Sequence, residues 1–382
     1  MDVFQQTTKI LQYAAVQEFL QEFSFRENDY ILASRSIYEA FFTDAIGKAS
    51  IAFHSDYGRG EPDDRMLDAM LRDMRKKQPD RIIAIGGGSV IDCAKLFVFE
   101  GNASAEEMFL QTCELVKTRE LIAIPTTCGS GSEVSRISIC ELTSLHTKLG
   151  LAIDELFPDQ AILIPELLSK LPFFYFVTSG IDALIHASES FVSPKANAYT
   201  RMFSKEAIRL LLHGFQVIAR KGEAARMQLL EDFMQASNFA GIAFGNTGTG
   251  AVHALSYPLS GIYHVTHGEA NYQFFTAVFQ TYEKLDPSCV AAIKELFSNA
   301  LSCPIEDAFP CMESLFSSLL ARKPLHEYGM QESEIEAFTD SVIKTQQRLL
   351  TNSAIPLERQ DILSIYQTLY EQRLPKRADA AG

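Results

Sequence analysis

The sequence lacks the features of a nucleic-acid-binding or membrane protein. It has 34 Lys and Arg against 48 Asp and Glu, a formal net charge of -14, and its basic residues are dispersed. This balance disfavours binding to nucleic-acid phosphates or anionic lipids. No stretch reaches the roughly 20 apolar residues of a membrane span, and the opening MDVFQQTTKI lacks a signal-peptide pattern. We therefore expect a cytoplasmic protein that has neither nucleic acid nor a membrane as its partner.

The cysteines follow no metal-binding or disulfide pattern. They are scattered, odd in number and include no Cys-x-x-Cys pair; the seven are Cys93, Cys113, Cys128, Cys140, Cys289, Cys303 and Cys311. A structural zinc site of the cysteine type has no suitable spacing here, and no disulfide framework is expected. The thiols are predicted to be reduced.

What the chain does contain indicates a folded protein of two domains. Hydrophobic residues make up 47% and charged residues 21%, and 382 residues exceed the usual size of one hydrophobic core. Short apolar runs begin at Tyr30, Ser50, Arg81, Leu121 and Ala161, and amphipathic segments such as residues 66–77 separate several of them. Strands that alternate with helices predict a parallel α/β sheet.

Helical patterns dominate after Pro172, for example over residues 197–219 and 334–350. We therefore predict an α/β nucleotide-binding domain over residues 1–170 and an all-helical domain over residues 171–382. Neither an internal repeat nor a low-complexity tract interrupts this division.

The glycine-rich loop after the third apolar run is a candidate phosphate-binding site. The Gly-x-Gly-x-x-Gly fingerprint is missing, but Gly86, Gly87, Gly88 and Ser89 follow RIIAI and open a helix-like segment. Glycines allow the backbone to approach a pyrophosphate closely, and free N–H groups with the helix dipole would stabilise its charge. Alone, this pattern also fits a tight strand-to-helix turn.

A second polar loop, residues 125–133 (PTTCGSGSE), follows the next apolar run. Loops at the carboxyl ends of parallel strands bind ligands in α/β folds, and the hydroxyl groups here are suited to ribose, phosphate or carboxamide. A serine-rich turn is the alternative for this loop alone. Two such loops after neighbouring strands favour a shared cofactor cleft.

Carboxylate and imidazole side chains later in the chain predict a metal site. Asp182 and His186 lie four residues apart and share one face of a helix. Farther along the chain, His253, His264 and His267 fall within one stretch of fifteen residues. Two of these imidazoles would complete a four-ligand site suited to Fe(II) or Zn(II). Singly, each residue is as well explained as a hydrogen-bonded core group or a cap.

Together these motifs resemble the iron-containing (group III) alcohol dehydrogenase family. Residues 86–95 resemble its glycine loop, residues 125–133 its Pro-Thr-Thr-x-Gly-Thr-Gly-Ser-Glu loop with Ser130 in place of Thr, and residues 180–187 its Gly-x-Asp-Ala-x-x-His-Ala segment. Val-His and His-Gly pairs match at His253 and His267. The resemblance implies an α/β domain, a helical domain, and an active site between them.

The resemblance also implies roles for individual residues. The implied metal ligands are Asp182, His186, His253 and His267, with Fe(II) favoured and Zn(II) as the alternative. The implied cofactor-binding residues are Gly86, Gly87, Gly88, Ser89, Asp92, Thr126, Thr127, Ser130 and Lys148. A homodimer is expected from the family.

Two departures from the family pattern matter. Tyr257 stands where many members have a proton-relay histidine, so Tyr257, His264 or a hydroxyl–water chain is left as the acid/base group. Residues 33–35 (Ala-Ser-Arg) stand where many members have an acid that contacts the adenosine ribose. Serine and arginine would not repel a 2'-phosphate, so NADP stays open beside NAD, which the closer resemblance favours.

Within the family, residues 254–272 most resemble members that interconvert 4-hydroxybutyrate and succinate semialdehyde. Arg136 is one candidate for binding the substrate carboxylate, although an isolated basic residue is more often a solvated surface charge. The alternatives are a dehydrogenase of uncharged alcohols or diols such as butanol and propanediol, a dehydroquinate-synthase-like lyase, and a non-catalytic nucleotide or metal sensor. The lyase would need a strongly basic phosphate pocket, which the sequence around the proposed ligands does not indicate.

Overall fold

A six-stranded parallel sheet forms the centre of the first half of the chain. The computed structural model describes residues 3–58, 60–145 and 147–371, so the ends of both predicted domains lie partly outside the described residues. The strand order is β1-β8-β5-β4-β2-β3. The strands are β1 (Lys9–Gln12), β2 (Asp29–Ala33), β3 (Ser50–Phe53), β4 (Arg81–Gly86), β5 (Glu120–Pro125) and β8 (Gln160–Leu163).

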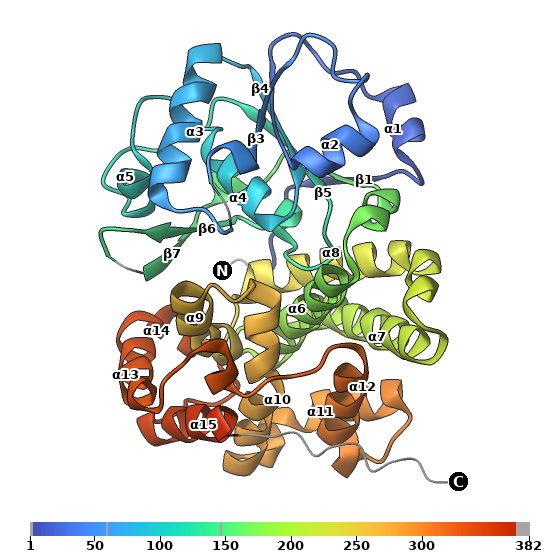
Figure 1. The fold of residues 1–382 in the computed structure, drawn as a ribbon, viewed down its shortest axis with the longest axis vertical. Helices are drawn as coiled ribbons and strands as arrows, with labels where there is room; N and C mark the ends of the chain where they lie inside the picture. Colours follow the sequence, from blue (N-terminus) through green and yellow to red (C-terminus); the bar gives the residue numbers. More distant parts are fainter. Residues whose placement is uncertain (1–2, 59, 146, 372–382) are drawn as a thin grey trace.

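The central strands β2, β4 and β5 are continuous apolar runs because both faces of the sheet are covered there. Alternate residues of β2 and β4 point to opposite sides: Leu32 and Ala84 join one core, Ile31 and Ile83 the other. Helices cover the two faces (Figure 1). They are α1 (Val16–Glu22), α2 (Arg35–Phe41), α3 (Asp64–Lys77), α4 (Gly88–Leu96) and α5 (Ala105–Phe109).

Five of the six strands coincide with the apolar runs in the sequence, which confirms the predicted α/β architecture. The edge strand β1 was not predicted, because only one of its four residues is even partly buried. The antiparallel hairpin of β6 (Ile137–Leu142) and β7 (Thr147–Ala152) was not predicted either. In Figure 1 this hairpin extends from the sheet half toward the helices of the second half.

The second half is helical throughout its described residues, as the sequence predicts. Its long central helix, α6, is buried along most of its length and packs against α7, α8 and α10. The helices are α6 (Phe173–Val192), α7 (Ala198–Lys221), α8 (Leu230–Thr247), α9 (Ala251–Tyr263), α10 (His267–Leu285), α11 (Pro287–Leu301), α12 (Ala308–Leu319), α13 (Ile335–Thr345), α14 (Gln347–Leu350) and α15 (Arg359–Glu371).

Of the two helices predicted in the second half, one is continuous in the structure and the other is interrupted. The helix predicted over residues 197–219 is α7, but the one predicted over residues 334–350 is broken at Gln346 into α13 and α14. The last strand of the sheet ends at Leu163 and α6 begins at Phe173, so the proposed domain boundary after residue 170 falls between them. None of the helices within the described ranges combines the length and apolar character that crossing a bilayer requires.

Register and strand order bring the two polar loops together. Strands β4 and β5 are neighbours, with Gly86 paired to Pro125 at their carboxyl ends. The loop after β4 begins α4, and the loop after β5 leads through the short helix η2 (Ser132–Val134), which packs against α8. Both loops therefore lie at the edge of the sheet that faces the helical half (Figure 1).

Candidate metal centre and cofactor cleft

Four of the residues singled out in the sequence converge at one point of the helical half. One ligand atom from each lies within 4.8 Å of the others, and the four, called the quartet below, are Asp182, His186, His253 and His267. They come from α6, α9 and α10. Three are buried, and the His267 side chain is 35% exposed, so the cluster is reached from that side.

Helix α6 supplies the first pair because residues four apart are separated by slightly more than one turn and so share a face. Asp182 and His186 are 5% and 4% exposed in the middle of this buried helix. A carboxylate is rarely buried without partners, since desolvation is costly. Their burial therefore indicates that neighbouring groups satisfy them.

Two short connections bring the other imidazoles to α6. His253 lies in the first turn of α9, and His267 is the first residue of α10. A Cβ atom at Gly268 would lie 2.4 Å from the carbonyl oxygen of Thr178 on α6. Only glycine permits this approach of α10 to α6, which explains why the sequence has a His-Gly pair at this point.

Hydrogen bonds fix the orientation of the three imidazoles. His186 Nδ1 donates to the carbonyl oxygen of Gly129 at 3.1 Å, and His253 Nδ1 donates to the Glu189 carboxylate at 2.6 Å. The Asn271 amide nitrogen lies 3.2 Å from His267 Nε2 and donates to Asp182 at 2.7 Å. The Nε2 atoms of His186 and His253 are thereby left with their lone pairs directed into the cluster, while the Nε2 atom of His267 lies next to the Asn271 amide.

These lone pairs show that the cluster fits a cation. The Nε2 atoms of His186 and His253 lie 3.0 Å apart, although the Nδ1 atom of each ring already carries the proton that its oxygen acceptor requires. Two lone pairs at this distance repel unless a proton or a metal ion lies between them. Three imidazole nitrogens and one carboxylate oxygen are suitable donors for a divalent transition metal.

Electrostatics within the quartet are consistent with this donor set. Burial lowers the pKa of His186 to about 4 and also lowers that of His267. Burial opposes the charge on Asp182, but the three imidazoles lower its pKa. At His253 burial is outweighed by the carboxylates of Glu189 and Asp182, which raise the pKa. The neutral rings of His186 and His267 and the ionised Asp182 carboxylate have the protonation states that metal binding requires, whereas His253, with its raised pKa, would release a proton when a metal binds.

Glu189 is a site residue that the sequence analysis missed. It is 2% exposed, and besides orienting His253 it accepts the backbone N–H groups of Gly250 and Val252 at 2.8 and 2.7 Å. It therefore caps the start of α9 as well as fixing one imidazole. A signal was available: Glu189 follows His186 by three residues, which places it on the same face of α6.

The predicted cofactor residues divide into accessible and buried groups. The accessible group is partly exposed along the two loops and comprises Gly87, Gly88, Ser89, Thr127 and Ser130. Gly86 and Thr126 are buried, with the Thr126 N–H donating to the Gly86 carbonyl across the neighbouring strand ends. The accessible group forms the strip on which a ligand could lie.

Asp92 is held by hydrogen bonds to neighbouring residues of the chain. Its carboxylate accepts a hydrogen bond from Ser132 Oγ and another, at 3.0 Å, from the backbone N–H of Ile139. The ammonium group of Lys95, which is 0% exposed, lies 3.6 Å from Asp92 and donates to Ser132 Oγ. Burial lowers the pKa of Lys95 to about 8. Through its hydrogen bond with Ser132, Asp92 therefore holds the loop after β5 in position.

Glycines of the loop after β5 contact the helical half. A Cβ atom at Gly129 would lie 2.7 Å from the Ser179 carbonyl oxygen, and one at Gly131 would lie 2.3 Å from Gly241 Cα on α8. Asn238 of α8 also donates to the buried Glu133 carboxylate at 2.9 Å. This loop therefore joins the two halves of the protein as well as bordering the cofactor strip.

Lys148 reaches the same cleft from the β6–β7 hairpin. Its ammonium group forms an ion pair with Glu61, donates to Ser260 Oγ at 2.9 Å, and lies 5.7 Å from the centre of the Tyr257 ring. Tyr257 is one turn beyond His253 on α9, and burial raises its pKa to about 12. The structure thus brings Lys148 and Tyr257 close to the quartet.

His264 and Arg136 are placed differently. His264 ends α9 in a left-handed conformation (φ 53°) and is exposed, and it is not part of the quartet. The guanidinium of Arg136 forms an ion pair with Asp154 and lies 3.4 Å from the side-chain oxygen of Gln5. Arg136 therefore already has a carboxylate partner.

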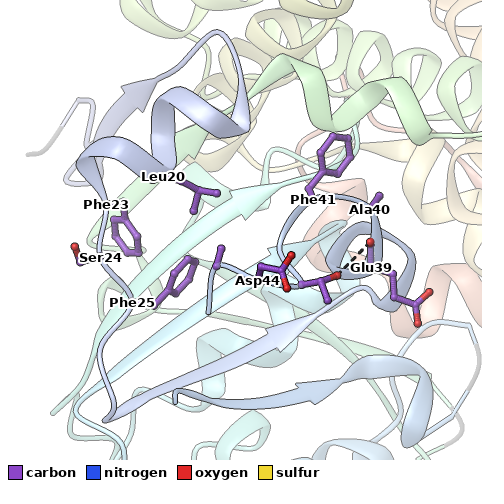
Figure 2. Close-up of a pocket in the computed structure, with 10 residues that line it drawn as sticks. Leu20, Phe23, Ser24, Phe25, Glu39, Ala40, Phe41 and Asp44 are labelled. Atoms are coloured by element: carbon purple, nitrogen blue, oxygen red, sulfur yellow. Dashed lines mark hydrogen bonds between the residues drawn. The ribbon is translucent and has the colours of Figure 1, made fainter. Parts of the chain in front are cut away.

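A pocket of about 630 Å³ lies elsewhere, beside α1 and α2. Figure 2 shows Phe23 and Phe25 on one side of it and Phe41 on the other. Its lining includes neither a member of the quartet nor a residue of the two polar loops. It does not bear on the chemistry of the metal centre.

Comparison with known families agrees with this architecture. The family model described as iron-containing alcohol dehydrogenase matches residues 8–165, and the one described as Fe-containing alcohol dehydrogenase family, C-terminal, matches residues 176–370. Among solved structures, that of 1,3-propanediol oxidoreductase has a TM-score of 0.82 at 23% identity, covering 96% of this chain and 99% of the other. Sulfoacetaldehyde reductase from Bifidobacterium kashiwanohense, solved with NAD+, has a TM-score of 0.81 at 22% identity, covering 97% and 99%.

Sequence relatives are more closely similar. The chain is 47% identical over 362 residues to 4-hydroxybutyrate dehydrogenase of Clostridium kluyveri, covering 94% of this chain and 98% of the relative. It is 30% identical to 1,3-propanediol dehydrogenase of Klebsiella pneumoniae, covering 74% of each chain.

The sheet-and-helix fold and the quartet define a two-domain oxidoreductase built around a candidate metal site. The chain belongs to the iron-containing alcohol dehydrogenase family. Membership favours the predicted oxidoreductase over the lyase and sensor alternatives.

Proposed function

We propose that the protein is a metal- and nicotinamide-dependent dehydrogenase that interconverts 4-hydroxybutyrate and succinate semialdehyde. The observation that carries the chemistry is the convergence of three imidazole groups and one carboxylate in the quartet. The observation that carries the substrate is the 47% identity to a 4-hydroxybutyrate dehydrogenase over nearly the full length of both chains.

The quartet would hold a divalent metal, with Fe(II) favoured by the family and Zn(II) as the alternative. When bound, such a metal supplies Lewis-acid chemistry toward the oxygen of the alcohol or aldehyde. Glu189, Asn271 and the Gly129 carbonyl hold the ligands in orientation. Because these partners are buried, the ligands need little reorganisation on binding.

The strip along Gly87, Gly88, Ser89, Thr127 and Ser130 would bind the cofactor, with backbone N–H groups at the start of α4 facing the phosphates. We infer NAD rather than NADP from charge. Arg35, the first residue of α2, is paired with Asp56 at 2.5 Å and stacks on Phe53, so its guanidinium already has an acidic partner. A 2'-phosphate at this edge would meet the Asp56 carboxylate.

For proton transfer we propose Tyr257 in preference to His264. Tyr257 lies one turn from His253 and beside Lys148, whereas His264 is exposed at the end of α9. A phenol is a weak acid, so Tyr257 would act as a donor during aldehyde reduction. We also propose that the protein is cytoplasmic and works as a homodimer, as expected from the family resemblance.

A second candidate is a dehydrogenase of uncharged primary alcohols or diols. It is supported by the similarity to 1,3-propanediol dehydrogenase and to the 1-propanol dehydrogenase of Salmonella typhimurium, the latter 34% identical over 55% of this chain. The two candidates share one chemistry and differ only in how the far end of the substrate is recognised.

The test combines metal analysis with a substrate screen. Protein purified without oxygen should contain one divalent metal per chain and oxidise 4-hydroxybutyrate with NAD faster than with NADP, and faster than 1-butanol or 1,3-propanediol. His267→Ala should lose both metal and activity, a decrease of at least about 1,000-fold in kcat/KM, while its circular dichroism is unchanged. Full metal content and activity in this variant would refute the assignment of the quartet.

A further inference from the structure

The proposed substrate, on which this inference rests, needs a cation at a set distance from the quartet. In an extended four-carbon hydroxyacid the carboxylate carbon lies about 5 Å from the hydroxyl oxygen. If the hydroxyl is directed to the quartet, the carboxylate reaches the surrounding side chains. A carboxylate removed from bulk water requires a positive partner there.

Two of the basic residues already discussed are engaged with acids. Lys148 forms an ion pair with Glu61 and also donates to Ser260. Arg136 is paired with Asp154 at the base of the hairpin. Neither offers an uncompensated positive charge to a substrate carboxylate.

Arg348, unlike Lys148 and Arg136, is a basic residue near α9 that is not paired with an acid among the described residues. It lies on the short helix α14, which packs against α9, the helix of His253 and Tyr257. A Cβ atom at Gly150 would lie 2.8 Å from Arg348 Nη2 and 3.4 Å from Cζ, so the guanidinium rests against the bare backbone of β7. Gly150 and Lys148 are two residues apart and share a strand face. The guanidinium therefore lies on the hairpin face that Lys148 directs toward α9.

The charge of Arg348 acts on the site. It is the largest charge effect at Tyr257, where it opposes the increase in pKa caused by burial, and it also opposes the increase in pKa at His253. Within the described residues its guanidinium has no hydrogen-bond acceptor or carboxylate partner, while its backbone carbonyl accepts from Thr351 and Asn352. Its side chain is exposed, so a ligand can reach it from solvent.

We propose that Arg348 binds the substrate carboxylate and so makes the enzyme selective for a hydroxyacid over an uncharged alcohol. The contact of Nη2 and Cζ with Gly150 holds the guanidinium beside α9 without using its charge. A planar guanidinium can bind both carboxylate oxygens at once, which fixes the direction of the chain toward the quartet. Lys148, neutralised by Glu61, borders the same path without competing for the anion.

The proposed role of Arg348 in binding the carboxylate is tested by measuring substrate selectivity. The ratio of kcat/KM for 4-hydroxybutyrate to that for 1-butanol is determined for the wild type, Arg348→Met, Arg348→Gln and Arg348→Lys. Because a charge-assisted hydrogen-bonded contact is lost, the ratio should fall roughly 10- to 100-fold in the Met and Gln variants and less in the Lys variant. Arg136→Met is the matched control, since Arg136 already has an acidic partner, and its ratio should equal that of the wild type.

A binding measurement separates recognition from catalysis. Butyrate carries the carboxylate without the hydroxyl, and its affinity for the metal-loaded enzyme, measured by calorimetry, should fall by a similar factor in Arg348→Met. A wild-type ratio and butyrate affinity in this variant would overturn the role of Arg348 alone. A wild-type enzyme that shows no preference for 4-hydroxybutyrate over 1-butanol would overturn the proposed substrate, and the role of Arg348 with it.

Discussion

The quartet and the glycine loop are held in place by different means. Each metal-ligand candidate is a side chain on a helix, and buried polar groups such as Glu189 and Asn271 set its orientation. The glycine loop depends on close packing against its own bare backbone: a Cβ atom at Gly88 would lie 2.7 Å from Ser130 Cβ. One region is specified by hydrogen-bond partners and the other by the absence of side chains. Substitutions should therefore affect the two binding functions separately.

The largest effect on one binding function alone is expected from substitution of Glu189, which should weaken metal binding. Glu189→Gln removes the charge that orients His253 and weakens the cap of α9. Since partners of metal-ligating histidines contribute strongly to affinity, the metal dissociation constant should increase about 10- to 100-fold. It is measured by competition with a chelator. The exposed Glu231 on α8 provides the control substitution to Gln.

If Glu189→Gln bound metal as tightly as the wild type, hydrogen bonding would not be what fixes His253. The comparison between the two regions would then be wrong for the metal centre. The circular dichroism of the variant shows whether the helical half has kept its structure.

The next effect is expected where the two regions meet. Gly241→Ala would place a methyl group 2.7 Å from Gly131 Cα, so the loop after β5 and α8 would have to separate. Overpacking of this kind typically costs about 1–3 kcal/mol of unfolding free energy. Urea denaturation measures it. Gly245→Ala, one turn later on α8, is the matched control, because its nearest neighbour would be 3.6 Å away.

Equal stability of Gly241→Ala and Gly245→Ala would show that the contact between the loop and α8 is loose. The loop would then not serve as a fixed connection between the halves.

The smallest effect is expected at the glycine loop itself. Gly88→Ala would press against Ser130 and widen the strip on which the cofactor is proposed to lie. We expect roughly a tenfold weaker affinity for NADH, about 1.4 kcal/mol, with metal content unchanged. Fluorescence titration of NADH and metal analysis of the same sample check both parts. Gly261→Ala is the control, since a Cβ atom there meets nothing within 4 Å.

Loss of metal from Gly88→Ala, with NADH affinity retained, would contradict the separation of the two regions. It would mean that the glycine loop acts mainly on the quartet.

The parts of the fold that could be predicted from the sequence are those with a strong local pattern. Strands β2, β4 and β5 are continuous apolar runs because both faces of the sheet are covered. Strand β1 has mostly exposed residues and gives no such signal. The break at Gln346 has no glycine or proline to mark it; Gln346 and Leu349 are buried by tertiary packing of α14 against α9.

The candidate site divides in the same way. Side chains with helical spacing, such as Asp182 and His186, could be proposed from sequence, and Glu189 could have been added by the same rule. The Gly129 carbonyl could not, because a backbone acceptor has no residue type. The packing of Gly129 and Gly131 against α6 and α8 could not be predicted either, because it depends on how the two halves of the chain meet.

The hydrogen bond from His186 Nδ1 to the Gly129 carbonyl crosses between the two halves of the protein. Gly129 belongs to the loop that also carries Thr127 and Ser130, so a shift of this loop changes the position of the imidazole. Two ligands that bias one such contact are linked thermodynamically, and the linkage is reciprocal. Whatever factor the cofactor contributes to metal affinity, the metal contributes to cofactor affinity, so the two dissociation constants form a closed cycle rather than two independent quantities.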